Sequence, residues 1–180
     1  MEAMTLKEKK KKIAEGILNV LSEKNRRYGN AALEPINIFY KGESTNSILI
    51  RLDDKMQRII NSMRGTIGEV SFRKNDMFDL LGYLVLLSIS EGYYKSEGEE
   101  KEFIEEVKVI INSIFKEINI EPYTDNILSS PYMKFVVTFE DIINSIKYEG
   151  VTKERILSLM VEIWKFFIIE DIYEFEDLID

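Results

Sequence analysis

The 180-residue sequence contains neither cysteine nor histidine. Without cysteine the chain has no disulfide, no thiolate nucleophile and no cysteine-ligated zinc or iron–sulfur cluster. Without histidine it has no Ser-His catalysis, no imidazole acid–base chemistry and few of the ligand sets that bind zinc. Any hydrolytic chemistry would therefore depend on carboxylates, lysines, arginines or tyrosines, together with a hard metal ion such as Mg²⁺ or Mn²⁺.

Long apolar runs are absent as well. No segment reaches the roughly 18 uninterrupted apolar residues that a membrane-spanning helix needs, and the N-terminus lacks the apolar stretch of a signal peptide. Hydrophobic residues nevertheless make up 45% of the chain, which suffices for a substantial core. We expect a cytoplasmic protein that does not contact the membrane.

Charge is divided unevenly along the chain. Residues 1–98 contain 16 Lys and Arg against 13 Asp and Glu, a balance of +3, whereas residues 99–180 contain 8 against 19, a balance of −11. A mildly basic half suits a phosphorylated small molecule, and a strongly acidic half argues against binding of duplex nucleic acid. We predict a helical domain over residues 1–98 and an acidic helical extension, packed on it, over residues 99–180.

Only three prolines and nine glycines interrupt the sequence, and its long stretches have helical periodicity. The pattern predicts an all-α fold, a helical bundle. The predicted helices span about residues 5–25, 46–64, 77–90, 99–118, 139–148 and 152–169. We expect Gly29 to follow the end of the first helix, Pro131 to lie in a loop, and Asn75 or Asp76 to cap the third helix. A short strand is considered near residues 69–72, and the aromatic residues around Trp164 are expected in the core or in a dimer interface.

Two carboxylates occupy positions where apolar residues would be expected. Asp53 lies on the apolar stripe formed, at helical spacings, by Leu49, Met56 and Ile60. Asp79 lies in a helix that has no polar face, three residues after Asp76. A buried charged aspartate needs a basic partner, hydrogen-bond donors or a cation, so these three acids suit a Mg²⁺ site. The alternatives are a structural salt bridge for Asp53, with Lys24 or an arginine, and a helix cap for Asp76.

Basic side chains accompany these acids. Lys24 extends the apolar line of the first helix, and Arg51, Lys55 and Arg58 lie beside Asp53 on the second. Arginine and lysine are the side chains that bind di- and triphosphates. Tyr28 could stack on a base. The alternatives are ordinary exposed charges for Arg26, Arg27 and Arg58, and simple packing for Tyr28.

Four motifs in this order resemble a known family. They are EKNRRYGN at residues 23–30, LEP at 33–35, RLDDKMQR at 51–58 and DMFDLLGY at 76–83. Together they resemble the nucleotide modification associated domain 1 family of phage and bacterial proteins. More distantly, the chain is similar to the MazG-like all-alpha nucleotide pyrophosphohydrolases. The resemblance covers about residues 13–87.

The resemblance implies a MazG-like helical core that forms a dimer or tetramer and hydrolyses a nucleoside triphosphate with Mg²⁺ or Mn²⁺ and a bound water. It implies metal ligands at Asp53, Asp76 and Asp79. It implies phosphate binding by Lys24, Arg51, Lys55 and Arg58, with Tyr28 near the base or ribose. The sequence departs from the MazG-like pattern, because adjacent aspartates, Asp53 and Asp54, replace two glutamates three residues apart, and Asp-x-x-Asp replaces Glu-x-x-Asp.

Our first hypothesis is therefore a Mg²⁺-dependent nucleotide pyrophosphohydrolase-like or nucleotide-binding protein of phage or anti-phage origin, acting as a homodimer. Glu23 is the candidate carboxylate that would orient or deprotonate the water. The alternative is a non-catalytic acidic binding or inhibitor protein that engages a protein partner through its acidic half. Deletion of residues 170–180 should be tolerated under the first hypothesis and should abolish partner binding under the second.

Overall fold

The computed structural model of the chain describes residues 4–35, 42–63, 72–94, 102–119 and 131–179. Within these ranges it is all α-helical and contains no strand, so the predicted fold class is confirmed. The helices are α1 (Leu6–Tyr28), α2 (Ser44–Met63), α3 (Lys74–Ser90), α4 (Phe103–Glu117), α5 (Pro131–Glu149) and α6 (Lys153–Ile169), followed by the short 3₁₀ helix η2 (Glu176–Leu178).

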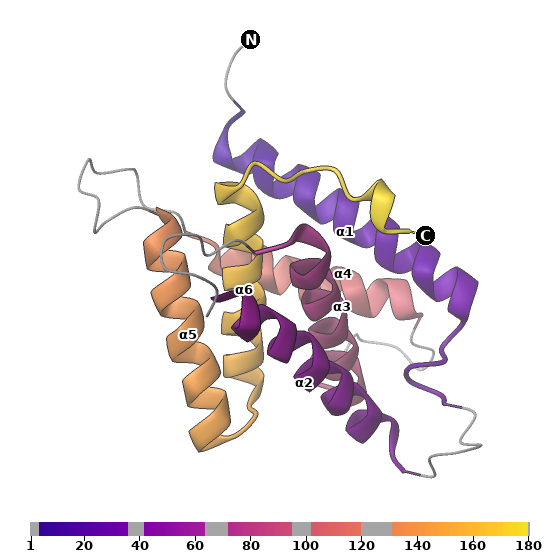
Figure 1. The fold of residues 1–180 in the computed structure, drawn as a ribbon. Helices are drawn as coiled ribbons and strands as arrows, with labels where there is room; N and C mark the ends of the chain where they lie inside the picture. Colours follow the sequence, from indigo (N-terminus) through magenta and orange to yellow (C-terminus); the bar gives the residue numbers. More distant parts are fainter. Residues whose placement is uncertain (1–3, 36–41, 64–71, 95–101, 120–130, 180) are drawn as a thin grey trace.

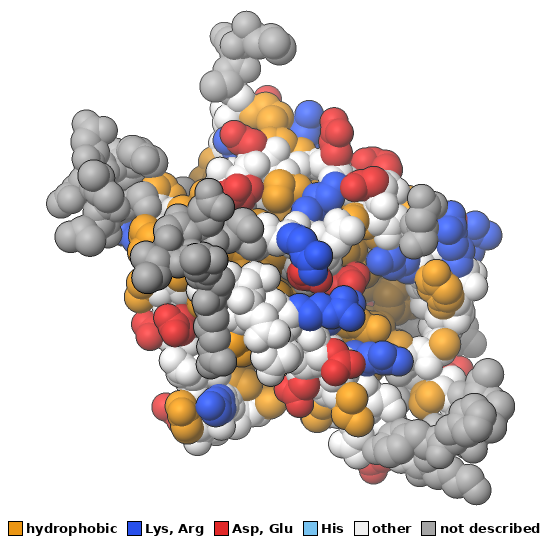
Figure 2. Space-filling view, in the orientation of Figure 1, with side chains coloured by type: hydrophobic (Ala, Val, Ile, Leu, Met, Phe, Trp, Pro, Cys, Tyr) orange, Lys and Arg blue, Asp and Glu red, His pale blue; other side chains and the backbone are white. Residues whose placement is uncertain are grey.

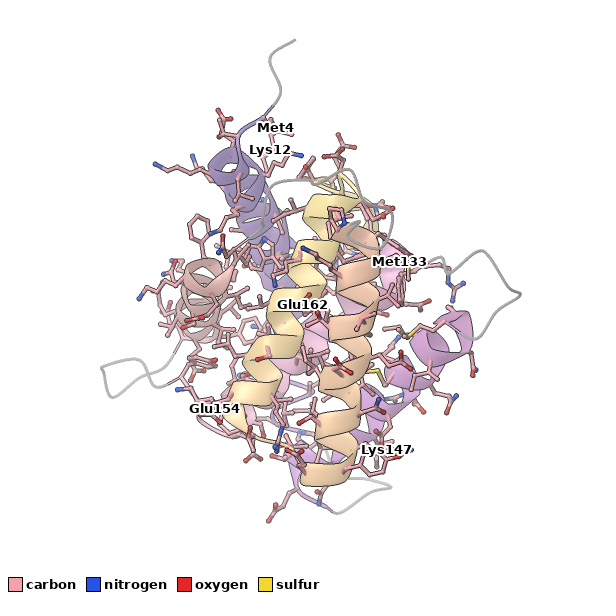
Figure 3. The ribbon with its side chains drawn as sticks, turned by 90° about the vertical axis from the view of Figure 1, so that its left-hand side faces the viewer. Met4, Lys12, Met133, Lys147, Glu154 and Glu162 are labelled. Carbon is pink, nitrogen blue, oxygen red and sulfur yellow. The ribbon has the colours of Figure 1, made fainter. Side chains whose placement is uncertain are left out.

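Helices α3 and α6 occupy the centre of the bundle (Figure 1). Helix α3 packs against α2, α4 and α6, and α5 lies along the outer side of α6, as Figure 3 also shows. Helix α1 packs against α4 and α6, so helices from both predicted halves of the chain contact one another. None of the described helices is both long and apolar enough to cross a lipid bilayer.

Local sequence signals fix several helix ends. The Thr5 side chain accepts a hydrogen bond from the Glu8 backbone, and the Glu8 carboxylate accepts one from the Thr5 N–H, which makes a capping box at the start of α1. Gly29 follows α1 with a φ of 58°, a conformation that favours glycine, so its predicted role is confirmed. Thr152 caps α6 by accepting a hydrogen bond from the backbone of Arg155.

Two local predictions differ from the structure, and a third falls largely outside the described residues. Pro131 is the first residue of α5, not part of a loop, because proline is tolerated in the first turn of a helix, where its missing N–H has no partner to lose. Helix α3 begins at Lys74, so neither Asn75 nor Asp76 is its cap. The strand considered near residues 69–72 lies outside the described residues except for Phe72, which is not in a strand.

Aromatic side chains fill the space between α3, α5 and α6. The Phe135 ring lies 5.5 Å from that of Phe166 and 5.3 Å from that of Phe139, measured between centroids, and Phe72 contacts all three. Trp164 is completely buried, which confirms its expected place in the core. Burial of these rings provides much of the hydrophobic stabilisation that joins α5 to the bundle.

The acidic C-terminal segment, residues 170–179, is not a free solvated end. It runs along α1 (Figure 1), and Phe175 is completely buried there. Lys9 donates to the Asp171 carboxylate at 2.9 Å and Lys74 to that of Asp177 at 2.6 Å, and these hydrogen bonds lower the pKa of both carboxyl groups. We therefore expect deletion of residues 170–180 to lower the stability of the bundle, and whether function tolerates the deletion stays a prediction.

Candidate ligand-binding cavity

An open cavity of about 550 Å³ lies between the C-terminal end of α1, the segment that follows it, α2 and α3. In Figure 2 it is the hollow on the right of the molecule, with hydrophobic atoms at its floor and Lys and Arg side chains around it. Its lining includes the rings of Tyr28 and Tyr83 and eight apolar residues: Leu21, Ala31, Ala32, Pro35, Ile48, Phe78, Leu86 and Phe103. A cavity of this size and composition suits a small organic ligand.

Three of the predicted substrate-binding residues line this cavity. Lys24 comes from the last turns of α1, Arg51 from α2, and Tyr28 from the end of α1. Tyr28 is 64% exposed, so its ring lies at the rim and does not contribute to the core. The cavity thus combines two cations with an exposed aromatic ring. Two of these residues belong to α1 and one to α2.

Asp79 lines the same cavity and has two basic partners. The Lys55 ammonium donates a hydrogen bond to Asp79 Oδ2 at 2.7 Å, and the Lys24 ammonium lies 3.7 Å from Asp79 Oδ1. Lys24 also lies 5.7 Å from the centre of the Phe78 ring, a favourable position for a cation. The inward acid predicted in α3 is therefore partly exposed to the cavity and compensated by lysines from α1 and α2.

The predicted inward position of Asp53 is wrong. Asp53 is exposed and does not line the cavity. The buried residues of α2 are Ile48, Leu52 and Ile59, so the face that packs on the bundle is rotated by about one residue from the stripe that placed Asp53 inside. Its neighbour Asp54 is exposed too, with one oxygen 4.0 Å from Arg51 Nη1.

Asp76 is buried and forms an ion pair with Arg73, the residue that precedes α3. The Arg73 Nη2 lies 2.7 Å from Asp76 Oδ2, and Arg73 Nε donates to the same oxygen at 2.8 Å. Among the residues that the structure describes, no three carboxylates form a group that could hold a metal ion. Asp53, Asp76 and Asp79 as they stand are therefore not a preformed ligand set for Mg²⁺, and the magnesium site stays a prediction.

Glu23 is engaged by two arginines. Arg26 donates to both oxygens of its carboxylate, at 2.7 and 2.6 Å, and Arg27 donates at 3.0 Å. These hydrogen bonds lower the pKa of Glu23 to about 2. A carboxylate that is so weakly basic and lies outside the cavity lining is poorly suited to deprotonate a water molecule there.

One predicted residue, Arg58, lies away from the cavity, and several residues that were not predicted line it. Arg58 is exposed on α2 and does not line the cavity, as the alternative of an ordinary surface charge proposed. The aromatic wall, formed by Phe78, Tyr83 and Phe103, was not predicted as part of a site. A usable signal was present in Gly82, a glycine inside an apolar helix and next to Tyr83, which itself lines the cavity.

Gly82 gives a simple test of the cavity floor. A Cβ atom added there would meet the Leu21 Cδ2 atom at 3.5 Å, an ordinary van der Waals distance. Gly82→Ala should therefore raise the free energy of unfolding by about 0.5–1 kcal/mol through helix propensity, and the Tm by about 2 °C. Thermal melts would check this, with Gly150→Ala as the control. That residue has a φ of 93°, so its substitution should lower the Tm. A loss of stability in Gly82→Ala would mean that the floor is tightly packed.

No protein-family model, curated protein or solved structure matches this chain. The resemblance to the nucleotide modification associated domain 1 family therefore stays a prediction that rests on the motifs themselves. All four of those motifs contribute residues to the cavity: the one at residues 23–30 provides Lys24 and Tyr28, and those at 33–35, 51–58 and 76–83 provide Pro35, Arg51 and Asp79.

Proposed function

We propose that the chain binds a nucleoside phosphate in this cavity. The supporting observation is that Lys24 and Arg51 stand on the wall of a mainly apolar cavity that also has aromatic side chains. The two cations would bind the phosphate, since lysine and arginine provide charge-assisted hydrogen bonds to phosphate oxygens. Phe78 and Tyr83 would contact the base and sugar, and Tyr28 at the rim is free to stack on the base.

Isothermal titration calorimetry with ribo- and deoxyribonucleoside mono-, di- and triphosphates tests this proposal. Lys24→Ala and Arg51→Ala should each weaken binding by about tenfold or more, because each removes a charged phosphate contact. Arg58→Ala is the matched control, since it removes an arginine from the exposed part of the same helix as Arg51. Absence of binding by the wild-type protein, or an equal loss in the Arg58 variant, would contradict the proposal.

Hydrolysis is a separate proposal that the family resemblance motivates. Of the three predicted metal ligands, Asp79 is the one at the cavity, and a metal ion that binds its Oδ2 atom would have to displace Lys55. The same nucleotide samples, supplied with Mg²⁺ or Mn²⁺ and assayed for pyrophosphate, would detect such activity. Turnover that EDTA abolishes would support the hydrolase, whereas binding without turnover would leave a nucleotide-binding protein.

The alternative, an acidic protein that engages a partner, has less support. Asp171 and Asp177 of the C-terminal segment are already paired with Lys9 and Lys74 of the same chain. Their charges are therefore partly compensated within the chain while the segment stays docked. The structure contains one chain, so the predicted homodimer stays a prediction.

A further inference from the structure

The charged groups at the cavity leave a surplus of positive charge. Lys24, Arg51 and Asp79 are the charged residues among its described lining. Lys55, which does not line the cavity, donates a hydrogen bond to Asp79. The four side chains together carry three positive charges and one negative charge, which leaves a balance of two positive charges.

The two oxygens of Asp79 have different surroundings. Oδ2 accepts the short hydrogen bond from Lys55, whose side chain is only 16% exposed. Oδ1 lies 3.7 Å from Lys24 Nζ, beyond hydrogen-bond distance, so it can still accept a hydrogen bond from a ligand hydroxyl. Lys55 is therefore the close partner of Asp79, and Lys24 is a looser ion-pair partner that can also reach a ligand.

Arg51 is available to a ligand as well. Its closest acidic neighbour, Asp54, lies 4.0 Å away, and both side chains are more than half exposed. A pair of this kind is weak because water and salt screen it. Lys24 and Arg51 thus provide two positive charges that no strong ion pair within the described residues compensates.

We infer that this cavity prefers nucleoside monophosphates to di- and triphosphates, and that Asp79 is the residue that determines this preference. The inference rests on the proposed function and names its ligand class. A phosphate monoester carries about −1.5 to −2 charges near neutral pH, which matches the two available cations. A second or third phosphate group would bring further negative charge beside the Asp79 carboxylate, whose charge Lys55 offsets only in part, and the remaining like-charge repulsion would weaken binding. The free Oδ1 would accept a hydrogen bond from the sugar.

Calorimetry in a buffer that contains EDTA tests this preference, with the mono-, di- and triphosphate of the nucleoside that binds best. The wild-type protein should bind the monophosphate about tenfold more tightly than the triphosphate. Asp79→Asn keeps the shape and one acceptor oxygen but removes the negative charge. This variant should bind the triphosphate more tightly than the wild type does, so that the preference largely disappears.

Two further variants make the result decisive. Asp54→Asn is the matched control, because it removes an exposed carboxylate that does not line the cavity, and it should keep the preference. Lys55→Gln leaves Asp79 uncompensated and should widen the preference, so it carries the test if Asp79→Asn does not fold. Equal affinities for the three phosphates in the wild type, or an equal change in Asp54→Asn, would overturn this inference and leave the proposed function intact. Failure of every nucleotide to bind would instead overturn the proposed function.

Discussion

Replacing Phe175 with alanine is expected to lower the free energy of unfolding by about 3–5 kcal/mol. The side chain is completely buried, and its ring lies 5.1 Å from that of Phe167 and 5.4 Å from that of Phe78. Its removal would leave a cavity between α1, α3 and α6 and would release the C-terminal segment. Urea denaturation, with the midpoint and slope compared to the wild type, measures the effect.

Glu174→Ala is the appropriate control for Phe175→Ala. Glu174 is exposed in the same segment, so its loss should change stability by less than about 0.5 kcal/mol. Phe78 contacts Phe175 and also lines the proposed binding cavity. Phe175→Ala should therefore weaken nucleotide binding, because Phe78 loses a packing partner. A Phe175 variant as stable as the wild type would mean that the segment does not dock on α1 in solution.

Helix periodicity was sufficient to predict the fold class and most of the helices, because each helix has an apolar stripe and several have recognisable ends. It was insufficient to orient α2. That helix has apolar residues on more than one line, since Ile48 and Ile59 are buried while Leu49 and Ile60 are half-buried. Which line faces the core depends on packing against α3, and this is why Asp53 was placed on the wrong side.

The partners of Asp79 could not be predicted from the sequence either. Its compensation comes from Lys55 and Lys24, which precede it by 24 and 55 residues and belong to different helices. Sequence spacing gives no information on contacts between helices, so a structural ion pair and a metal ligand could not be distinguished. The residue types were nevertheless informative, because Lys24, Tyr28, Arg51 and Asp79 were selected for phosphate, base and metal binding and all line one cavity.

The C-terminal segment shows a different limit. Its apolar residues at 172, 175 and 178 form no helical pattern long enough to predict that the segment is buried. The structure buries Phe175 and Leu178 against the bundle while the neighbouring acids stay at the surface. A short segment of this kind packs on the bundle through one or two buried side chains, here mainly Phe175. The residues that form the packing site for this side chain are far apart in the sequence, so only the structure shows them.

That packing site contains Gly16, and Gly16→Ala is expected to lower the free energy of unfolding by about 1–3 kcal/mol. A Cβ atom at this position would lie 2.5 Å from Phe175 Cδ2, too close for any real contact, so the ring or α1 would have to move. Gly82→Ala, also inside a helix, is expected to have the opposite sign because its Cβ meets only Leu21 at 3.5 Å. Denaturation of the two variants side by side would therefore separate local packing from helix propensity.

The double variant Gly16→Ala/Phe175→Ala makes this argument quantitative. Without the Phe175 ring, the added methyl group has space, and alanine should then be neutral or up to about 1 kcal/mol more favourable in α1 than glycine. The two substitutions should consequently be non-additive, with a coupling free energy of about 1–3 kcal/mol in a double-mutant cycle. Additive effects would show that Gly16 and Phe175 do not contact each other, and the docked position of the C-terminal segment would have to be abandoned.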